Sequence, residues 1–298
     1  MMFGTRDRFT YLACASCGCL ELLNPPADLS PYYPRNYYSI ARGRFDIWLR
    51  FLVSPSVTRH WLGRVSPAGY LLSRGLQRLP VLDWLGSRPV QKGSQLLDVG
   101  SGAGQLLFFL RGMGFGRLVG VDPFIQADLQ FPGGIAILKR QLSEVVGSFD
   151  YIVFHNSYEH MKDPLQVLKQ ARSLLAPGGQ LIISTPIASS FAWREYGVDW
   201  VQLDAPRHLF IPSVKGLEIL AKQAGLRVQE VVYNSTEFQF WGSEQYKMGI
   251  PLTDKRSYRR SPKGSAFTPA QIASFRQRAD ELNAVDDGDS ASFYLEAS

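Results

Sequence analysis

The stretch LLDVGSGAG, residues 96–104, followed by GVDP at residues 120–123, constrains the fold of this chain more than any other feature. A short apolar run ends in Asp98, three glycines then alternate with other residues, and a second apolar run ends in Asp122. Glycine permits the tight turn that brings a ligand against bare main chain. The pattern predicts strand, glycine turn, helix and strand, the first half of a nucleotide-binding α/β sheet. Asp122 is then placed to accept hydrogen bonds from both hydroxyls of a ribose.

Details of this turn indicate which nucleotide binds. The dinucleotide spacing G-x-G-x-x-G would require a glycine at position 105, where this chain has Gln. Asp98 lies two residues before the first glycine, where a carboxylate would repel a pyrophosphate. A carboxylate there suits a ligand with a positive end, such as the ammonium or sulfonium of S-adenosylmethionine. On these residues the chain resembles the class I S-adenosylmethionine-dependent methyltransferases, whose first motif has this form.

Apolar segments of strand length alternate with helical patterns beyond residue 95, and this alternation predicts a mostly parallel sheet covered on both faces. Helix starts are well signalled at Asp163-Pro164 and in FTPAQI, residues 267–272. Gly225 is typical of a helix end. We therefore expect an α/β, Rossmann-like fold with a seven-stranded, mostly parallel sheet, its strands at residues 96–99, 118–121, 135–138, 149–154, 180–184, 227–233 and 291–295.

Composition divides the chain into three parts. Residues 1–40 contain all three cysteines and a stretch rich in Pro and Tyr, and we expect a truncated Cys-rich appendage. Residues 41–92 are expected to form a basic helical cap, and residues 93–298 the class I methyltransferase domain. An insertion at residues 249–286 precedes the last expected strand. Within the cap, prolines are expected to divide the stretch into short helices, at Pro55, Pro67 and Pro80.

The net charge of +6 belongs to the N-terminal third. Residues 1–95 hold eleven Arg and one Lys against five acids, which gives +7 and leaves −1 for the rest. Such a patch can meet phosphate groups, a basic amphipathic stretch can lie on a membrane, and a solvated helix surface is the third interpretation. No run approaches the roughly 18 apolar residues of a membrane span, and no signal-peptide pattern follows Arg6 to Arg8. We expect a cytoplasmic location.

Two segments that follow predicted strands hold three of the four histidines, FHNSYEHMKDP at residues 154–164 and WVQLDAPRHLF at residues 200–210. Carboxyl ends of parallel strands face the ligand crevice, so we expect both segments near the cofactor. If the acceptor is a hydroxyl, a general base contributes about 10²–10⁴-fold, and histidine suits that role. A structural role for any single histidine stays open. The candidate catalytic residues are His208 first, His160 second, and Arg207 to hold a carboxylate or phosphate of the acceptor.

The same segments strengthen the resemblance. EH-x-x-DP at residues 159–164 looks like the common bacterial methyltransferases that include quinone and small-molecule enzymes. W-x-x-LD-x-PRH at residues 200–208 resembles a bacterial subgroup linked to polysaccharide or sugar biosynthesis. By this resemblance ten residues would bind the cofactor: Asp98, Gly100, Ser101, Gly102 and Gly104 at its methionine part, Asp122 and Pro123 at ribose and adenine, Gln141 and Leu142 at the adenine edge, and Asn156 at the pocket floor.

The resemblance also bears on metals. Metal-assisted quinone methyltransferases carry a further acid three residues before the Glu of EH, where this chain has Asn156. We therefore expect no catalytic metal. Cys14, Cys17 and Cys19 look like half a zinc ribbon, but structural zinc needs four ligands. We expect zinc only if a fourth ligand is recruited.

The sequence thus predicts methyl transfer from S-adenosyl-L-methionine, with oxygen of a small polar or phosphorylated acceptor, such as a sugar, as the target. A lipid or quinone methyltransferase at the membrane surface is the enzyme alternative. A non-catalytic protein that holds the cofactor as a scaffold is the alternative from another class. A nucleic-acid partner is not expected, because no RNA-binding module is evident. The sequence indicates no oligomeric state.

Overall fold

The computed structural model describes residues 2–33, 44–74, 76, 81–82, 85 and 93–298. The chain forms two compact units. The first comprises Met1–Tyr33, Asn156–Leu165 and Ser184–Tyr294, and the second comprises Pro34–His155, Gln166–Ile183 and Leu295–Ser298. Residues 40 and 92, where we place the predicted boundaries, fall outside the described residues, so the three-part division stays a prediction.

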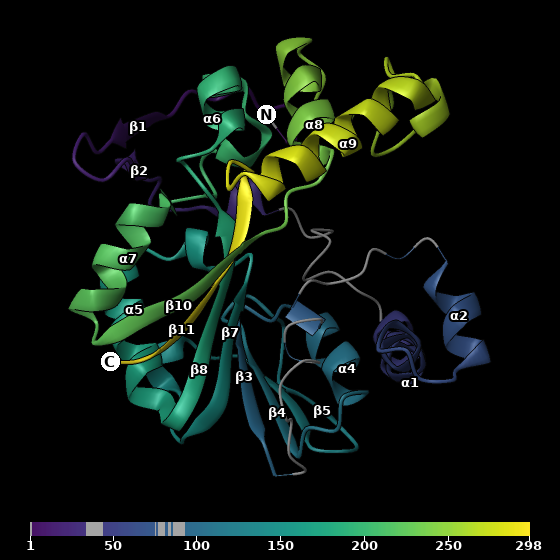
Figure 1. Ribbon diagram of the computed structural model, residues 1–298, viewed down its shortest axis with the longest axis vertical. Coiled ribbons are helices and arrows are strands. Elements are labelled where there is room, and N and C mark those ends of the chain that lie inside the picture. The colour runs from purple at the N-terminus through teal and green to yellow at the C-terminus, as the bar shows by residue number, and fades with distance from the viewer. Residues whose placement is uncertain (1, 34–43, 75, 77–80, 83–84, 86–92) are drawn as a thin grey trace. The chain divides into compact units, whose positions relative to one another are not determined.

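Four parallel strands form the core of the second unit (Figure 1). β3 (Gln95–Val99) pairs with β4 (Arg117–Val121) and with β7 (Phe149–His155), and β4 pairs with β6 (Ile135–Leu138). Most of their side chains are buried, as expected for strands covered on both faces. Parallel pairing brings the carboxyl ends of these strands to one edge of the sheet, where ligands bind in such folds.

Eight of the described strands form one sheet, in the order β10-β11-β8-β7-β3-β4-β6-β5. All seven predicted strands are present, the remaining three as β8 (Leu175–Pro186), β10 (Leu226–Tyr233) and β11 (Ser290–Ala297). The predicted count of seven is nevertheless wrong, because β5 (Leu129–Phe131) pairs antiparallel with β6 at the sheet edge. Three residues are too few for a recognisable alternation of apolar and polar side chains.

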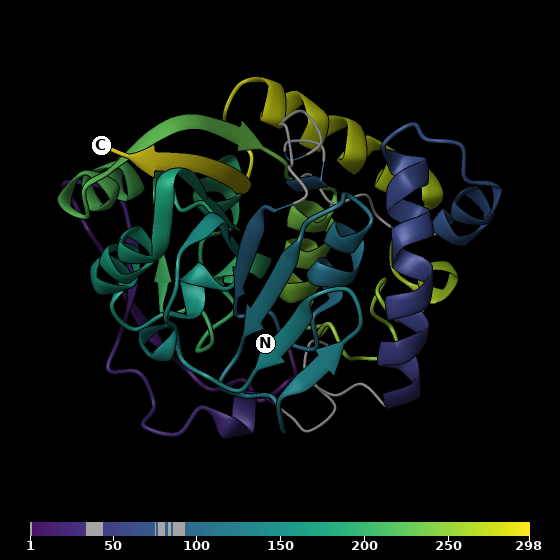
Figure 2. The ribbon, with the colours of Figure 1, turned by 90° about the horizontal axis from the view of Figure 1, so that it is seen from below.

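The helix α1 (Arg44–Trp61) passes through Pro55 without a break (Figure 2), so the expected division at this proline is wrong. A proline inside a helix removes one hydrogen bond and costs roughly 3 kcal/mol. Tertiary packing offsets that cost. Phe51 is 3% exposed, and the Thr58 hydroxyl donates a 2.8 Å hydrogen bond to the carbonyl oxygen of Phe109.

The other helices of the second unit begin as the sequence predicts. Pro67 occupies the first turn of α2 (Pro67–Ser73), and the Ser66 hydroxyl accepts a hydrogen bond from the backbone N–H of Gly69. The glycine turn leads directly into α4 (Gln105–Arg111). The predicted break at Pro80 lies outside the described residues.

The first unit contains an antiparallel sheet of three strands. β1 (Thr10–Ala13) pairs with β2 (Leu20–Leu23), and β2 pairs with β9 (Phe210–Ile211). The three cysteines therefore lie on an ordered hairpin that is tied to a segment far along the chain. Residues 1–33 belong to this unit, which does not support the separate appendage that the sequence predicts.

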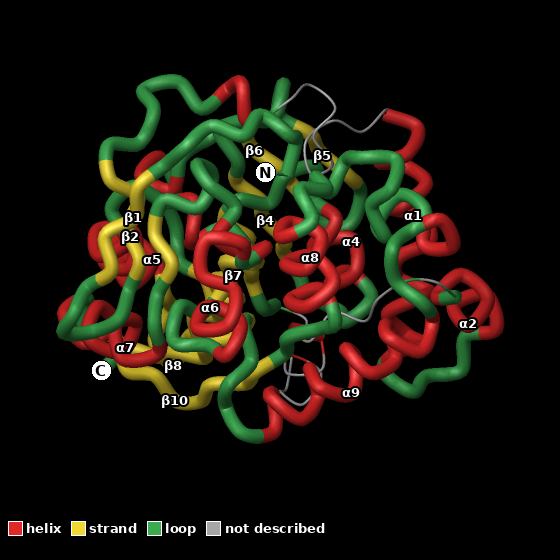
Figure 3. Tube along the Cα trace, turned by 90° about the horizontal axis from the view of Figure 1, so that it is seen from above, coloured by secondary structure: helices red, strands yellow, loops and turns green. Residues whose placement is uncertain are grey.

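A second apolar core lies in the first unit and includes side chains of α6 (Phe191–Tyr196), α8 (Phe238–Lys247) and α9 (Pro269–Ala284). Figure 3 shows these three helices. Trp200 is completely buried in this core, and its indole N–H donates a 2.9 Å hydrogen bond to the Asp289 carboxylate. Burial raises the pKa of Asp289 to about 6. The indole donor therefore stabilises a carboxylate that is 2% exposed.

The predicted helix boundaries in this part of the chain are confirmed. α5 (Pro164–Leu174) starts at Pro164, and α7 (Val214–Gln223) ends just before Gly225, whose φ is +71°. α9 begins with a reciprocal capping box between Thr268 and Gln271. Within the described ranges, no helix combines the length and apolar character that crossing a membrane requires.

Replacing Trp200 by Phe should lower the free energy of unfolding by about 1–3 kcal/mol, because the buried Asp289 carboxylate loses a donor. Urea unfolding followed by circular dichroism measures this. Trp193→Phe is the matched control, since Trp193 is only partly buried against the same core. Equal losses in the two variants would contradict the role assigned to the indole hydrogen bond.

Candidate active site

The glycine turn after β3 has the backbone geometry that the sequence predicts. Gly100, Gly102 and Gly104 have φ values of +76°, +51° and +82°, in the region that favours glycine. The backbone N–H of Gly100 donates to the carbonyl oxygen of Val121 at 2.8 Å, which ties the turn to β4. A Cβ atom on Gly104 would lie 2.2 Å from the Ile137 side chain. The turn is thus closely packed and presents main chain to a ligand.

Two carboxylates lie buried beside this turn. Asp98 is 2% exposed and Asp122 is 7% exposed. The Asp122 carboxylate accepts hydrogen bonds from the backbone N–H groups of Gly102, at 2.9 Å, and Phe124, at 2.8 Å. Burial raises the pKa of Asp98 to about 8, and repulsion from Asp122 adds to the rise. Burial also raises the pKa of Asp122, against the two backbone donors, which lower it.

These acids provide the test of whether the site fits the expected cofactor. Buried carboxylates with raised pKa values favour a ligand that brings positive charge or hydroxyl donors. S-adenosylmethionine brings both, through its ammonium and sulfonium groups and its ribose hydroxyls. The donor set of the turn therefore fits this cofactor, whereas a pyrophosphate would add negative charge beside Asp98.

The other predicted cofactor residues of the second unit follow the adjacent strands. Pro123 comes directly after Asp122 at the end of β4. Gln141 is the N-cap of a short 3-10 helix that runs from Leu142 to Glu144. The Gln141 backbone N–H donates a 2.7 Å hydrogen bond to the Glu144 carboxylate. Leu142 is buried. These residues come from β4 and from the segment after β6, two neighbouring strands of the sheet.

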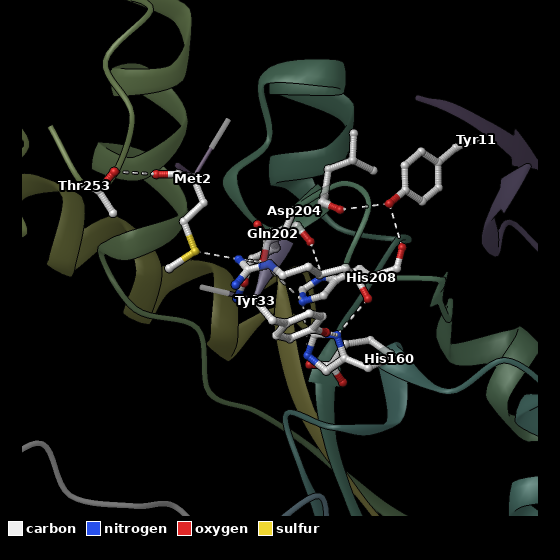
Figure 4. A network of polar contacts seen from close by, with 11 residues as sticks. Met2, Tyr11, Tyr33, His160, Gln202, Asp204, His208 and Thr253 are labelled. Atoms are coloured by element: carbon white, nitrogen blue, oxygen red, sulfur yellow. Dashed lines mark hydrogen bonds and ion pairs between the residues drawn. The ribbon is translucent and has the colours of Figure 1, made fainter. Parts of the chain in front are cut away.

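The first unit holds a compact polar cluster, which we name the EHH cluster, made of Glu159, His160 and His208. Figure 4 shows the two histidines of this cluster. The possible ligand atoms of these side chains all lie within 4.8 Å of one another. His208 Nε2 is 3.9 Å from Glu159 Oε1 and 3.8 Å from Asp204 Oδ2. Glu159 and His208 are 1% and 5% exposed. Two imidazole rings and two carboxyl groups thus lie close together, with Glu159 and His208 buried and His160 and Asp204 half-buried.

Backbone carbonyls fix the orientation of both imidazoles. His160 Nδ1 lies 2.8 Å from the carbonyl oxygen of Arg207, and His208 Nδ1 lies 2.7 Å from that of Gln202. A carbonyl oxygen only accepts, so the proton of each neutral ring belongs on Nδ1. Each Nε2 atom then carries the lone pair.

Burial shifts the pKa values of the EHH cluster toward the neutral forms. It raises the pKa of Glu159 to about 8 and lowers that of His160. Burial lowers the pKa of His208 well below its usual value, and the charges of His160 and Arg207 lower it further. Both imidazoles are therefore neutral near pH 7 and able to accept a proton.

Arg207 lies in a different environment from the one the sequence suggests. Its side chain is 3% exposed, forms an ion pair with Asp204 and donates to the Met2 sulfur. The Tyr11 hydroxyl donates a 2.6 Å hydrogen bond to the carbonyl oxygen of His208. These contacts favour Arg207 as a residue that holds the loop of His208, and they do not support its predicted role as a clamp for the acceptor.

Asn156 lies in the first unit, apart from the other predicted cofactor residues in the sequence. Its backbone has φ +52°, and its N–H donates to the carbonyl oxygen of Ser184 at 2.9 Å. The preceding residue, His155, has its Nδ1 atom buried, and burial lowers the pKa of this histidine to about 4. His155 is half-buried and has a neutral ring, which is in line with the structural role left open for any single histidine.

Sequence reasoning missed several members of the site. Thr185 donates a 3.1 Å hydrogen bond to Glu159 Oε2, and Tyr33 has its hydroxyl 3.3 Å from His160 Nδ1. Met2 and Tyr11 support the loop of His208 from the N-terminal segment. Thr185 comes directly after a predicted strand, and this position is a weak sign of a site residue. No local sequence pattern points to Met2, Tyr11 or Tyr33.

The cysteines form a separate feature of the first unit. They line a shallow pocket of about 210 Å³ with Glu21 and apolar residues. Hydrogen bonds from Ser16 and Cys17 lower the pKa of Cys14 to about 6, and burial raises that of Cys19 to about 11. In the part of the chain that the structure describes, the three thiols are not gathered into a metal-sized group as the EHH cluster is. Structural zinc gains no support.

The parallel sheet, the glycine turn and the acid at the end of the next strand define a nucleotide-cofactor-binding α/β protein. A family model described as a methyltransferase domain matches residues 67–231. The chain therefore belongs to this methyltransferase family, and it is an S-adenosylmethionine-dependent methyltransferase.

The chain is similar to two named O-methyltransferases and to a solved structure. Ubiquinone biosynthesis O-methyltransferase from Pseudomonas aeruginosa is 30% identical over 170 residues, which cover 51% of this chain and 72% of the relative. The corresponding protein of Xanthomonas campestris pv. campestris is 28% identical over 170 residues, covering 50% and 70%. A cyclopropane synthase structure from Mycobacterium tuberculosis has a TM-score of 0.46 and 14% identity, covering 86% of this chain and 99% of that chain.

Cofactor affinity should rise with pH between 5.5 and 7.0. Asp98, whose pKa is raised to about 8, is protonated in this pH range. A cationic ligand favours the ionised form of Asp98, so binding must release its proton. The limit is about tenfold in affinity per pH unit for one linked proton, and the ligand's α-amino group stays charged throughout this range. Calorimetric titration of S-adenosylhomocysteine measures the slope. Asp98→Asn should flatten it, and an unchanged slope in this variant would contradict the assignment.

Proposed function

We propose that this chain transfers a methyl group from S-adenosylmethionine to a hydroxyl oxygen of a small molecule, and that the EHH cluster accepts the hydroxyl proton. The observation that carries this proposal is the pair of imidazoles whose Nδ1 atoms face backbone carbonyls, with His208 Nε2 beside the carboxyl groups of Glu159 and Asp204. The family supplies the reaction type. The cofactor, when bound, supplies an electrophilic methyl group.

The cofactor is held by the turn after β3 and by the strands beside it. Asp98 would compensate the positive methionine end, where the turn of Gly100, Ser101, Gly102 and Gly104 offers main chain. Asp122 would accept hydrogen bonds from the ribose hydroxyls. The adenine would lie against three residues after the neighbouring strands, Pro123, Gln141 and Leu142, with Asn156 at the pocket floor. The burial of both acids supports these roles.

Chain connectivity supports the joint use of the two sets of residues. β3 and β7 are parallel neighbours, with Asp98 opposite Val153 and Val99 opposite Phe154. β7 ends at His155, and Glu159 and His160 follow within a few residues. A short stretch of chain therefore links the strand that pairs with β3 to two members of the EHH cluster.

His208 is the first candidate for the proton acceptor. Its Nε2 carries the lone pair, and the lowered pKa keeps the ring neutral near pH 7. The Asp204 carboxylate, whose Oδ2 is 3.8 Å from His208 Nε2, would stabilise the imidazolium once a proton arrives. His160, whose ring centroid is 4.8 Å from that of His208, is the second candidate.

The names of two relatives support one class of acceptor. Both are named for ubiquinone biosynthesis and O-methylation, which supports an aromatic hydroxyl of the quinone-precursor type. The sugar acceptor and the polysaccharide subgroup stay sequence predictions without support from these relatives. An aromatic hydroxyl also has a lower pKa than a sugar hydroxyl, so a neutral histidine deprotonates it more easily.

A lipid-linked acceptor at the membrane surface gains support from a second observation. Between residues 47 and 82 the chain carries five Arg and no Asp or Glu. Large apolar side chains on α1, on α2 and between them are exposed, with Leu52 at 65%, Val65 at 96% and Leu71 at 61%. Exposed apolar groups among arginines suit an interface with anionic lipid.

His208→Gln and Asp122→Asn should separate chemistry from cofactor binding. His208→Gln should keep the affinity for S-adenosylhomocysteine and lower kcat on a hydroxylated aromatic acceptor by about 10²–10⁴-fold. Asp122→Asn should weaken that affinity at least about tenfold, because a carboxylate is lost from the ribose contact. Calorimetry and product detection measure both. Full turnover in His208→Gln would remove this residue from catalysis, and tight binding in Asp122→Asn would refute the cofactor site.

Neutralising three exposed arginines of the α1–α2 region should abolish vesicle binding if the acceptor is reached at a membrane. The variant is Arg59→Gln, Arg64→Gln and Arg74→Gln, tested by co-sedimentation with phosphatidylglycerol vesicles. The control removes the same charge from α5, α7 and the loop before α9, as Lys169→Gln, Lys222→Gln and Lys263→Gln. Failure of the unmodified protein to bind vesicles would exclude the membrane alternative.

A further inference from the structure

We propose that the Tyr246 hydroxyl donates a hydrogen bond to a second oxygen atom of the methyl acceptor, near Asp204 and His208. Tyr246 belongs to α8, which lies beyond the part of the chain that the family model matches. An assignment to this residue therefore adds to what the family supplies. The identity of the bound molecule as the acceptor rests on the proposed function, whereas the binding of an oxygen-bearing ligand at Tyr246 does not.

One face of α8 packs against the segment that leads to Asp204. It consists of four buried residues at the i, i+3, i+4 and i+7 spacing of a single helix face: Gln239, Gly242, Ser243 and Tyr246. The Ser243 hydroxyl accepts a 3.0 Å hydrogen bond from the backbone N–H of Val201, and a Cβ atom on Gly242 would lie 2.8 Å from the Val201 side chain. This face is therefore fixed against the turn directly before Asp204.

The Tyr246 hydroxyl is buried without a hydrogen-bond partner among the residues that the structure describes. Tyr246 as a whole is 5% exposed. Buried tyrosine hydroxyls usually have a partner, and one without a partner lowers the stability of the folded chain. Phenylalanine would fill the same space without this cost. The hydroxyl is therefore best explained by a hydrogen-bond acceptor that a ligand brings.

Charged side chains near the EHH cluster act on this hydroxyl. Burial raises the pKa of Tyr246 well above its usual value, and the charge of Asp204 raises it further. The charges of Arg207 and Arg259 act in the opposite direction. The hydroxyl therefore stays protonated and is available as a donor. Asp204 Oδ2 is also 3.8 Å from His208 Nε2, so a ligand with two oxygen atoms suits both groups, one oxygen at His208 and the other at Tyr246.

A ligand reaches this region through its partly exposed members. Asp204 and His160 are half-buried, whereas Tyr246 is covered by its neighbours. Met2 belongs to the same buried apolar cluster as Tyr246, and its sulfur accepts a hydrogen bond from Arg207. Methionine is unbranched and adapts its shape to its surroundings. We therefore expect the Met2 side chain to move when a ligand binds the Tyr246 hydroxyl.

Urea unfolding of the ligand-free chain tests whether this hydroxyl has a partner within the protein. Tyr246→Phe should raise the urea midpoint, because a buried hydroxyl without a partner is removed. Tyr158→Phe is the matched control and should lower the midpoint, since the Tyr158 hydroxyl donates a 3.1 Å hydrogen bond to the carbonyl oxygen of Pro164. A lower midpoint in Tyr246→Phe, or failure of this variant to fold, would overturn the proposal.

Binding of simple phenols tests the second oxygen. The probes are phenol and the three dihydroxybenzenes, titrated into the full-length chain with and without S-adenosylhomocysteine and followed by NMR. At least one dihydroxybenzene should bind about fivefold or more tightly than phenol, and Tyr246→Phe should remove this preference. Tyr258→Phe is the matched control and should keep it, because Tyr258 is only partly buried against the same apolar cluster.

Two results of these titrations would contradict the proposal. One is no binding, or equal affinity for all the probes, in the unmodified chain, and the other is a preference that survives in Tyr246→Phe. Product detection separates both from failure of the proposed function. A dihydroxybenzene that binds with the expected preference but receives no methyl group supports the Tyr246 site and refutes the proposed function. Where methyl transfer occurs, Tyr246→Phe should raise KM more than it lowers kcat, whereas His208→Gln should mainly lower kcat.

Discussion

The burial of carboxylates at the ends of parallel strands is the constraint on which the cofactor site depends. Asp98 and Asp122 lie at the ends of β3 and β4 with 2% and 7% exposure, and backbone donors reach only Asp122 among the hydrogen bonds described above. An apolar pair would stabilise the sheet more, since burial of charge costs free energy that hydrophobic packing does not. The acids are therefore best explained by a ligand that brings compensating charge and donors.

The EHH cluster also holds buried titratable side chains, but loops, and not strand ends, orient its two imidazole rings. The carbonyls of Gln202 and Arg207 orient the two imidazoles, so the backbone path of residues 202–207 decides where both Nε2 atoms lie. That path is held from the N-terminal segment, since Tyr11 donates to the carbonyl oxygen of His208. The N-terminal hairpin thus contributes to the geometry of the site without supplying one of its three members.

Local patterns explain why the cofactor half could be predicted and the rest could not. The turn of Gly100 to Gly104, the acid at Asp122 and the capping box of Thr268 are each contiguous in sequence, and the structure has them as expected. The contact of Thr185 with Glu159 and that of Tyr11 with His208 join segments far apart, for which one sequence holds no signal. β5 is too short for periodicity, and the packing of Phe51 and Thr58 outweighs the helix-breaking tendency of Pro55.

The buried titratable groups also couple stability to ligand binding. As pH rises from about 4 toward 8, the folded chain keeps protons on Asp98 and Glu159 that the unfolded chain releases, so both acids lower the free energy of unfolding. As pH falls below about 6.5, the unfolded chain protonates histidines that burial keeps neutral, and stability falls again. A cationic ligand beside Asp98 opposes the first loss, because it favours the ionised carboxylate. The cofactor site therefore lowers stability when it is empty and is stabilised by the ligand that it binds.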